Sequence, residues 1–193
     1  MLLENQFAFK EWAVVCAALA TGRQTLILRK GGIHEGREGF RVEHGEFWLF
    51  PTKFHQRRED VVSEAWPLLD EVQSCGQPSE VSLDLYAVVE EVHHLFDRSA
   101  LARLSGRHIW SEATVEQRFN YRTPGLFALV VRLFRRSVPL MLTDSPDFAG
   151  CKSWVDLHTP ISTVGLHPVV DGSTFAQEQH QIREALASEM RPV

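Results

Sequence analysis

The segment of residues 12–20 constrains the fold more than any other, because nearly every residue in it is apolar. It is shorter than the about 20 apolar residues that a membrane-spanning helix needs. It is also too apolar for a protein surface, so it must be buried in a core. We expect it to belong to a strand over residues 7–20 that is central in a sheet and covered on both faces. Gly22 lies in the short segment that follows, which predicts a hairpin turn to an antiparallel strand over residues 24–30.

The rest of the chain alternates between predicted strands and helices. Alternating apolar residues and short apolar runs indicate strands, whereas apolar spacings of three and four indicate helices. The expected strands cover residues 47–50, 81–89, 126–135, 140–143 and 153–157, and the expected helices cover residues 58–74, 97–104, 111–119 and 174–190. Pro67 should bend or interrupt the first of these helices, and Ser173 should cap the last. These elements predict an α+β fold, a mixed, largely antiparallel β-sheet or partial barrel with flanking helices and a C-terminal helix.

The length and composition fit one intracellular domain. A chain of 193 residues lies within the range of about 100–200 residues that is usual for a domain. We expect a single domain over residues 1–193, with residues 1–76 and 79–193 as candidate sub-structures. The N-terminal segment carries Glu4 and has no positive region before its apolar residues, unlike a secretory signal. The three widely spaced cysteines match neither a disulfide framework nor a zinc site. We expect a cytoplasmic protein without membrane contact, metal or cofactor.

Residues 31–46 differ in composition from the segments around them, with five glycines, four glutamates, two arginines and two histidines. This composition predicts a loop, and a loop of this length in a compact domain is usually functional or mobile. Arg41 in the loop is followed by Trp48, Lys53 and His55, which together make a basic and aromatic cluster. The glycines match no phosphate-binding loop pattern, which requires fixed spacing between a strand and a helix.

The order of elements in the first third of the chain resembles the opening of the Nudix hydrolases. It consists of a hairpin, a glycine-rich loop, a strand that ends in Phe-Pro, and an acidic helix. That resemblance implies a magnesium site on a diphosphate, to which Arg58-Glu59 and Glu64 would contribute. The upstream glycine and glutamate of the Nudix pattern are replaced by His44 and Phe50.

The charged residues are arranged in blocks along the chain. Residues 59–97 contain ten acidic residues and no basic ones, whereas residues 98–136 contain eight arginines, no lysine and two acidic residues. Arginine binds phosphate or carboxylate with a planar fork and also stacks on bases, so this block favours contact with a nucleotide or nucleic acid. The candidate binding residues in the block are Arg118, Arg122 and Arg132, with the aromatic residues Trp110 and Tyr121. The alternative is that the acidic and basic blocks belong to two elements that pack together through surface ion pairs.

Several segments together resemble a bacterial family, the domain of unknown function 1802. They are Phe9-Lys10-Glu11-Trp12, Leu28-Arg29-Lys30-Gly31-Gly32-Ile33, Phe50-Pro51-Thr52 with His55-Gln56, His108-Ile109-Trp110, and Gly150-Cys151-Lys152-Ser153-Trp154-Val155. The resemblance covers nearly the whole chain. It implies no activity, since that family has none assigned, and the association of the family with restriction-modification systems implies a nucleic-acid-related context.

A second resemblance concerns residues 105–136, where a small helix leads into strands. This arrangement is similar to the PUA-like barrels that bind RNA or modified bases. It implies that Arg118 and Arg122 approach the nucleic acid and that Trp110 or Tyr121 stacks on a base.

The leading functional hypothesis is a nucleic-acid-binding or nucleotide-binding module, accessory to restriction-modification or to another bacterial defence or nucleic-acid-processing system. Two alternatives stay open. One is a metal-dependent nucleotide phosphohydrolase that acts through the Nudix-like opening. The other is a protein-interaction subunit that binds a protein partner and no small ligand.

Overall fold

The computed structural model of the chain describes residues 1–30, 42–75, 80–143, 145–150 and 152–187. These residues form one open sheet of seven strands, in which the order is β2-β5-β4-β3-β1-β6 and β7 pairs with β5. The strands are β1 (Glu4–Trp12), β2 (Leu26–Arg29), β3 (Glu46–Thr52), β4 (Glu80–Leu95), β5 (Leu126–Thr143), β6 (Trp154–Ser162) and β7 (His167–Pro168). Only the β1–β3 pair is parallel among the described strand pairs. The predicted α+β class with a largely antiparallel sheet is confirmed, and the sheet does not close into a barrel.

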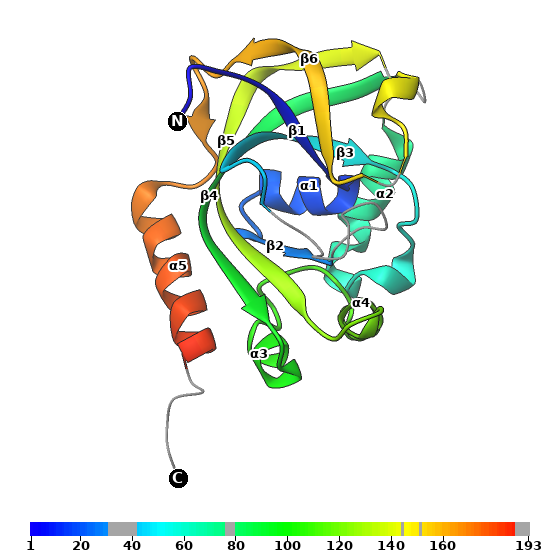
Figure 1. Ribbon diagram of the computed structural model, residues 1–193, viewed down its shortest axis with the longest axis vertical. Helices are drawn as coiled ribbons and strands as arrows, with labels where there is room; N and C mark the ends of the chain where they lie inside the picture. Colours follow the sequence, from blue (N-terminus) through cyan, green and yellow to red (C-terminus); the bar gives the residue numbers. More distant parts are fainter. Residues whose placement is uncertain (31–41, 76–79, 144, 151, 188–193) are drawn as a thin grey trace.

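The helices are α1 (Ala13–Ala20), α2 (Trp66–Ser74), α3 (Arg98–Arg103), α4 (Glu112–Asn120) and α5 (Gly172–Ala187). Figure 1 shows α1 in the middle of the molecule, with the strands curving around it and α2 beside it. The C-terminal helix α5 lies at the outside of the fold, on the other side from α2 and α4. β3, within residues 1–76, pairs with β4, within residues 79–193, so the two candidate sub-structures share one sheet.

The apolar segment of residues 12–20 is a helix, so the prediction of one strand over residues 7–20 was wrong. β1 ends at Trp12 and α1 begins at Ala13. Most side chains of α1 are buried, on all sides of the helix, so no amphipathic pattern marks it in the sequence. Gly22, at φ +70°, ends α1 in a Schellman arrangement, in which the amides of Gly22 and Arg23 donate to the carbonyls of Leu19 and Ala18. The predicted hairpin is therefore absent, and β2 pairs with β5.

The predicted helix over residues 58–74 is correct only in its second part. Residues Arg58–Asp60 (η1) and Ser63–Ala65 (η2) form 3₁₀ turns, and α2 begins at Trp66. Pro67 lies in the first turn of α2, where a missing amide hydrogen removes no helical hydrogen bond. Pro67 therefore begins this helix and does not interrupt it.

β5 continues through Pro139, whereas two shorter strands were predicted there. Its register on β4 jumps between the pairs Leu85–Arg135 and Leu83–Leu140, so Pro139 lies in an irregular section of the pairing. Proline is tolerated at such a bulge because no ladder hydrogen bond is required of its nitrogen.

Helix caps explain where the short helices begin. Asp97 accepts a hydrogen bond from the amide of Ser99, and Ser111 accepts one from the amide of Thr114, as the predicted starts of α3 and α4 require. The cap of α5 is Asp171 and not the predicted Ser173, since Asp171 Oδ1 accepts from the amides of Ser173 and Thr174 at 2.9 Å each. None of the helices in the described ranges is long and apolar enough to cross a membrane.

Candidate nucleic-acid interface

A cleft of about 330 Å³ lies at the N-terminus of α1, where β1 ends. It is lined by Trp12, His55, Arg57, Asp60, Gln117 and Arg118. These residues come from the end of β1, the segment after β3, η1 and helix α4. We refer to this group as the Arg118 cleft.

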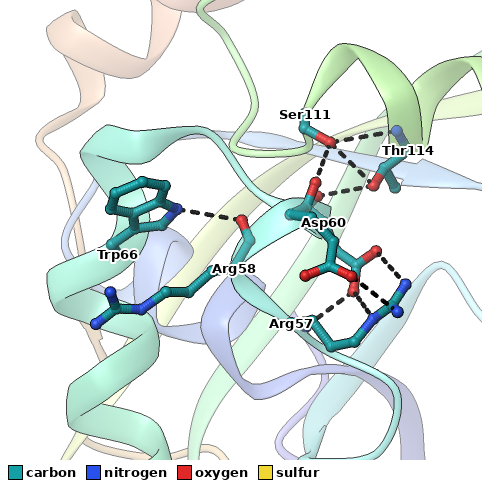
Figure 2. Close-up of polar contacts among 7 residues, drawn as sticks. Arg57, Arg58, Asp60, Trp66, Ser111 and Thr114 are labelled. Carbon is teal, nitrogen blue, oxygen red and sulfur yellow. Dashed lines mark hydrogen bonds and ion pairs between the residues drawn. The ribbon is translucent and has the colours of Figure 1, made fainter.

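The wall of the Arg118 cleft is held in place by hydrogen bonds between η1 and the start of α4 (Figure 2). The backbone carbonyl of Asp60 accepts from the amide of Ser111 at 3.0 Å and from Thr114 Oγ1 at 2.9 Å. Ser111 Oγ also donates to the carbonyl of Glu59 at 2.7 Å. The carboxylate of Asp60 accepts from the backbone amide of Arg57 at 2.8 Å. Because these bonds join the two walls, Arg57 and Arg118 face the same space from a fixed framework.

Arg118 packs against two aromatic rings. Its guanidinium carbon lies 5.4 Å from the ring centroid of Trp12 and 6.0 Å from that of Trp110. The two indole rings are 5.8 Å apart. Within the described residues, no hydrogen bond or ion pair joins the Arg118 guanidinium to another side chain. Its donors are therefore oriented by cation–π contacts and remain open to a ligand.

Two buried side chains meet the N-terminus of α1 behind Trp12. Glu11 Oε1 accepts from the amide of Trp12 at 2.7 Å, and Gln56 Oε1 accepts from the amide of Val14 at 3.1 Å. Glu11 is 3% exposed and Gln56 is 5% exposed. Among the described residues, the second polar atom of each, Glu11 Oε2 and Gln56 Nε2, has no hydrogen-bond partner. Buried polar atoms without partners are uncommon, since each costs about 1–3 kcal/mol.

The charge of Glu11 is influenced by burial and by two arginines. Burial raises the pKa of Glu11 above its ordinary value, while the positive charges of Arg29 and Arg118 act in the opposite direction. Arg29 Nη2 is also hydrogen-bonded to Ser153 Oγ at 2.5 Å. Glu11 thus links the Arg118 cleft to a polar group inside the sheet.

The segment Lys53–Gln56 forms the edge of the cleft beside His55. His55 has a φ of +58°, a left-handed conformation that histidine adopts more readily than most residues but which is still uncommon. Phe54, next to it, is 76% exposed. Lys53 Nζ donates to the carbonyl of Cys75, so this predicted binding residue is directed toward the end of α2. Lys53 does not line the Arg118 cleft.

Three of the predicted binding residues come together at the cleft, namely Arg118, His55 and Trp110. Trp48 does not join them, because its ring is fully buried, packs against Tyr86 and donates from Nε1 to the carbonyl of Asn5. Trp48 is therefore part of the core and not of the cleft lining.

The other predicted residues lie away from the cleft lining. Arg122 and Tyr121 follow the end of α4, where the Arg122 guanidinium lies 5.3 Å from the Tyr121 ring. Arg132 is on β5, over the rings of Phe134 and Phe175. Arg41 lies outside the described residues. Of the three arginines Arg118, Arg122 and Arg132, Arg118 alone is among the described residues that line the cleft.

The acidic residues of the Nudix-like opening are also dispersed. Arg58 pairs with Asp70, and Glu64 accepts from Ser63. Across the parts of the chain that the structure describes, His, Cys, Asp and Glu residues form no group of three or more that could hold a metal ion. Because residues 58–65 form two 3₁₀ turns and not an α-helix, they do not present the acids as the helix of the Nudix pattern would.

Comparisons with known proteins identify the family. The sequence profile of the domain of unknown function DUF1802 matches residues 8–181. The chain belongs to this family. Among solved structures, this DUF1802 chain is similar to ASCH from Zymomonas mobilis, with a TM-score of 0.44, 13% identity, and coverage of 92% of this chain and 93% of that one. A mutant form of the same ASCH gives a TM-score of 0.42 and 15% identity, with coverage of 78% and 87%. No curated protein matches the chain.

The segments that carry the DUF1802 resemblance converge on one place in the fold. Glu11 and Trp12, His55 and Gln56, and Trp110 all lie at or directly behind the Arg118 cleft. Ser153, from the last of those segments, bonds to Arg29 beside Glu11. The roles of Glu11, Trp12 and Gln56 were missed in the sequence because the segments are up to about 140 residues apart. Each of these family segments contains a charged or polar residue, and this shared feature is the sequence signal that could have pointed to them.

Proposed function

We propose that this chain is a nucleic-acid-binding or nucleotide-binding module and that the Arg118 cleft is its binding site. The observation that supports this most strongly is the environment of Arg118, a guanidinium over two indole rings without a hydrogen-bonded acidic partner among the described residues. The guanidinium influences the pKa of Glu11 but forms no hydrogen bond to it among the described contacts, so its donors are available to an anionic ligand. Phosphate accepts from the planar fork of arginine with two parallel hydrogen bonds.

The surroundings of Arg118 support an anionic ligand with an aromatic part. Trp12 offers an apolar surface at the cleft, and His55 and Gln117 offer polar groups. The cleft volume of about 330 Å³ is at the lower end of the range of about 300–1,000 Å³ for small-ligand sites. It is therefore suited to one nucleotide unit at a time. A place beside a restriction-modification or other nucleic-acid-processing system is part of this proposal, since those systems act on nucleic acid.

The test is direct binding at several salt concentrations. Fluorescence anisotropy of labelled RNA and DNA oligonucleotides of mixed sequence should show binding to the full chain that weakens steadily from 50 to 200 mM salt. For a single strand, the logarithm of the binding constant should fall against the logarithm of salt concentration with a slope of about 0.7 for each phosphate contact. Competition with nucleoside monophosphates would then measure how much of the affinity one nucleotide unit contributes. Salt-independent binding, or no binding to RNA, DNA or nucleotides, would contradict the proposal.

A further inference from the structure

Phe54 is the most exposed large aromatic side chain among the described residues, at 76%. The chain on both sides of it is anchored. Thr52 Oγ1 donates to the carbonyl of Glu11 at 3.1 Å, Lys53 donates to the carbonyl of Cys75, and Gln56 accepts from the amide of Val14 at 3.1 Å. Phe54 is therefore presented to solvent by a fixed segment, immediately before the His55 that lines the cleft.

The buried polar side chains behind Trp12 support the cleft and are not part of its lining. Glu11 and Gln56 are at most 5% exposed, and the lining consists of Trp12, His55, Arg57, Asp60, Gln117 and Arg118. Contact with a ligand therefore falls to the lining residues and to Phe54, which directly precedes His55. An exposed aromatic ring can stack on the face of an unpaired base. In a duplex the base faces are stacked on one another, so they are not free for such a contact.

We propose that the Arg118 cleft selects single-stranded nucleic acid by taking up one unpaired base, with Phe54 as a stacking surface for the base or its neighbour and Arg118 on the adjoining phosphate. This inference rests on the proposed function and narrows its ligand to a class. Aromatic stacking is the usual way in which proteins hold unpaired bases without strong sequence preference. Binding through Arg118 alone would not distinguish one strand from two, because both carry phosphates.

The experiment compares one labelled 12-nucleotide strand, as RNA and as DNA, with the duplex of the same sequence, using fluorescence anisotropy and the full chain. Wild-type protein should bind the single strand at least about tenfold more tightly than the duplex. Phe54→Ala should weaken single-strand binding by about 5- to 100-fold, which is the range for loss of one stacked base. It should leave duplex binding nearly unchanged.

The control variant is Phe96→Ala, which removes another highly exposed phenylalanine, 68% exposed, that contacts His94 and does not line the cleft. It should bind the single strand as wild type does. Both substitutions are at the surface, and equal thermal unfolding midpoints would show that the fold is kept. Equal affinity for strand and duplex, or an unchanged affinity of Phe54→Ala for the single strand, would overturn this inference. Binding of the oligonucleotide in such an experiment would still support the proposed function. Absence of binding to every oligonucleotide would overturn both.

Discussion

Arg118 and Arg132 have similar immediate contacts and different surroundings. Each guanidinium carbon lies near two aromatic ring centroids, at 5.4 and 6.0 Å for Arg118 and at 5.5 and 5.9 Å for Arg132. Within the described residues neither has an ion pair, and Arg132 Nε is buried without a partner. Arg118 lines a cleft, whereas Arg132 lies beneath the start of α5, with Nη2 3.6 Å from the position that a Cβ on Gly172 would take.

This difference separates a binding arginine from a packing arginine. Phe175, one of the two rings near Arg132, belongs to α5 and is buried, so the helix covers this guanidinium and uses it as part of its contact surface. Trp12 and Trp110 contact Arg118, which nevertheless lines the cleft together with Trp12. An arginine packed on aromatic rings thus has two roles in this account, ligand binding at Arg118 and packing at Arg132. The difference is that α5 covers Arg132.

The largest expected effect is on ligand binding. Arg118→Ala should weaken oligonucleotide binding by about 10- to 100-fold, because a charge-assisted hydrogen bond to phosphate contributes about 1.5–3 kcal/mol. The dependence of the binding constant on salt concentration should also become less steep, by the amount expected for the loss of one phosphate contact. Arg132→Ala should bind within about twofold of wild type, since a distant, independent site adds no coupling. Anisotropy titrations of both variants measure this, and equal losses in the two would remove the distinction between the arginines.

The second effect is on the free energy of unfolding, and here the substitution of Arg132 should have the larger effect of the two. Arg132→Ala should lower the free energy of unfolding by about 1–2 kcal/mol, because its alkyl chain and cation–π contacts support α5. Arg118→Ala, at a more open position, should cost less than Arg132→Ala. Urea denaturation followed by circular dichroism compares the two. A more stable Arg132→Ala would instead mean that the buried, unpaired charge costs more than its packing contributes.

The third effect concerns the N-termini of α4, which carries Arg118, and of α5, which packs on Arg132. Ser111→Ala removes the cap of α4 and the bond to the Glu59 carbonyl, and should destabilise the chain by about 1 kcal/mol. Ser173→Ala is the matched control, because Asp171 caps α5. It should cost less in the same denaturation measurement. Ser111→Ala should also weaken binding, since the α4 wall of the Arg118 cleft is held by this residue; unchanged binding would show that the wall does not depend on it.

The smallest effect is the pH dependence that arises from Glu11. Burial raises its pKa in the folded state above the ordinary value of 4.5, so the folded chain holds this proton more tightly than the unfolded chain. The stability from this carboxyl is complete below about pH 4.5 and is lost as pH rises through the raised folded pKa. Glu11→Gln cannot ionise, so its stability relative to wild type should increase from pH 4 to pH 7. Urea denaturation at the two pH values tests this, and a decrease would show that the arginines outweigh burial.

Local sequence signals predicted the elements that are exposed on one face. The alternation over residues 81–89 gave part of β4, and the capping residues Asp97 and Ser111 gave the starts of α3 and α4. The failures were at buried places. α1 is apolar all round, so periodicity could not separate a helix from a central strand. Pro139 indicated the end of a strand because the irregular pairing that accommodates it depends on β4, which is distant in sequence.

The candidate site was predictable only in part for the same reason. The arginine block pointed to Arg118, but it also contained Arg132, and composition does not show that α5 covers one and not the other. Trp48 has the residue type of a stacking platform, yet β3 directs its ring into the core. Glu11, Trp12 and Gln56 acquire their roles through the N-terminus of α1, a helix that was not predicted.

The most direct test of the account follows the five tryptophan indole N–H signals in a ¹H–¹⁵N NMR titration with a single-stranded oligonucleotide. Trp12 and Trp110 contact Arg118, whereas Trp48 is buried and Trp66 donates to the carbonyl of Arg58. We predict that the signals of Trp12 and Trp110 shift on binding, that the signal of Trp48 does not, and that Arg118→Ala abolishes the shifts at the same oligonucleotide concentration. Binding that leaves Trp12 and Trp110 unshifted would place the ligand elsewhere and contradict the account.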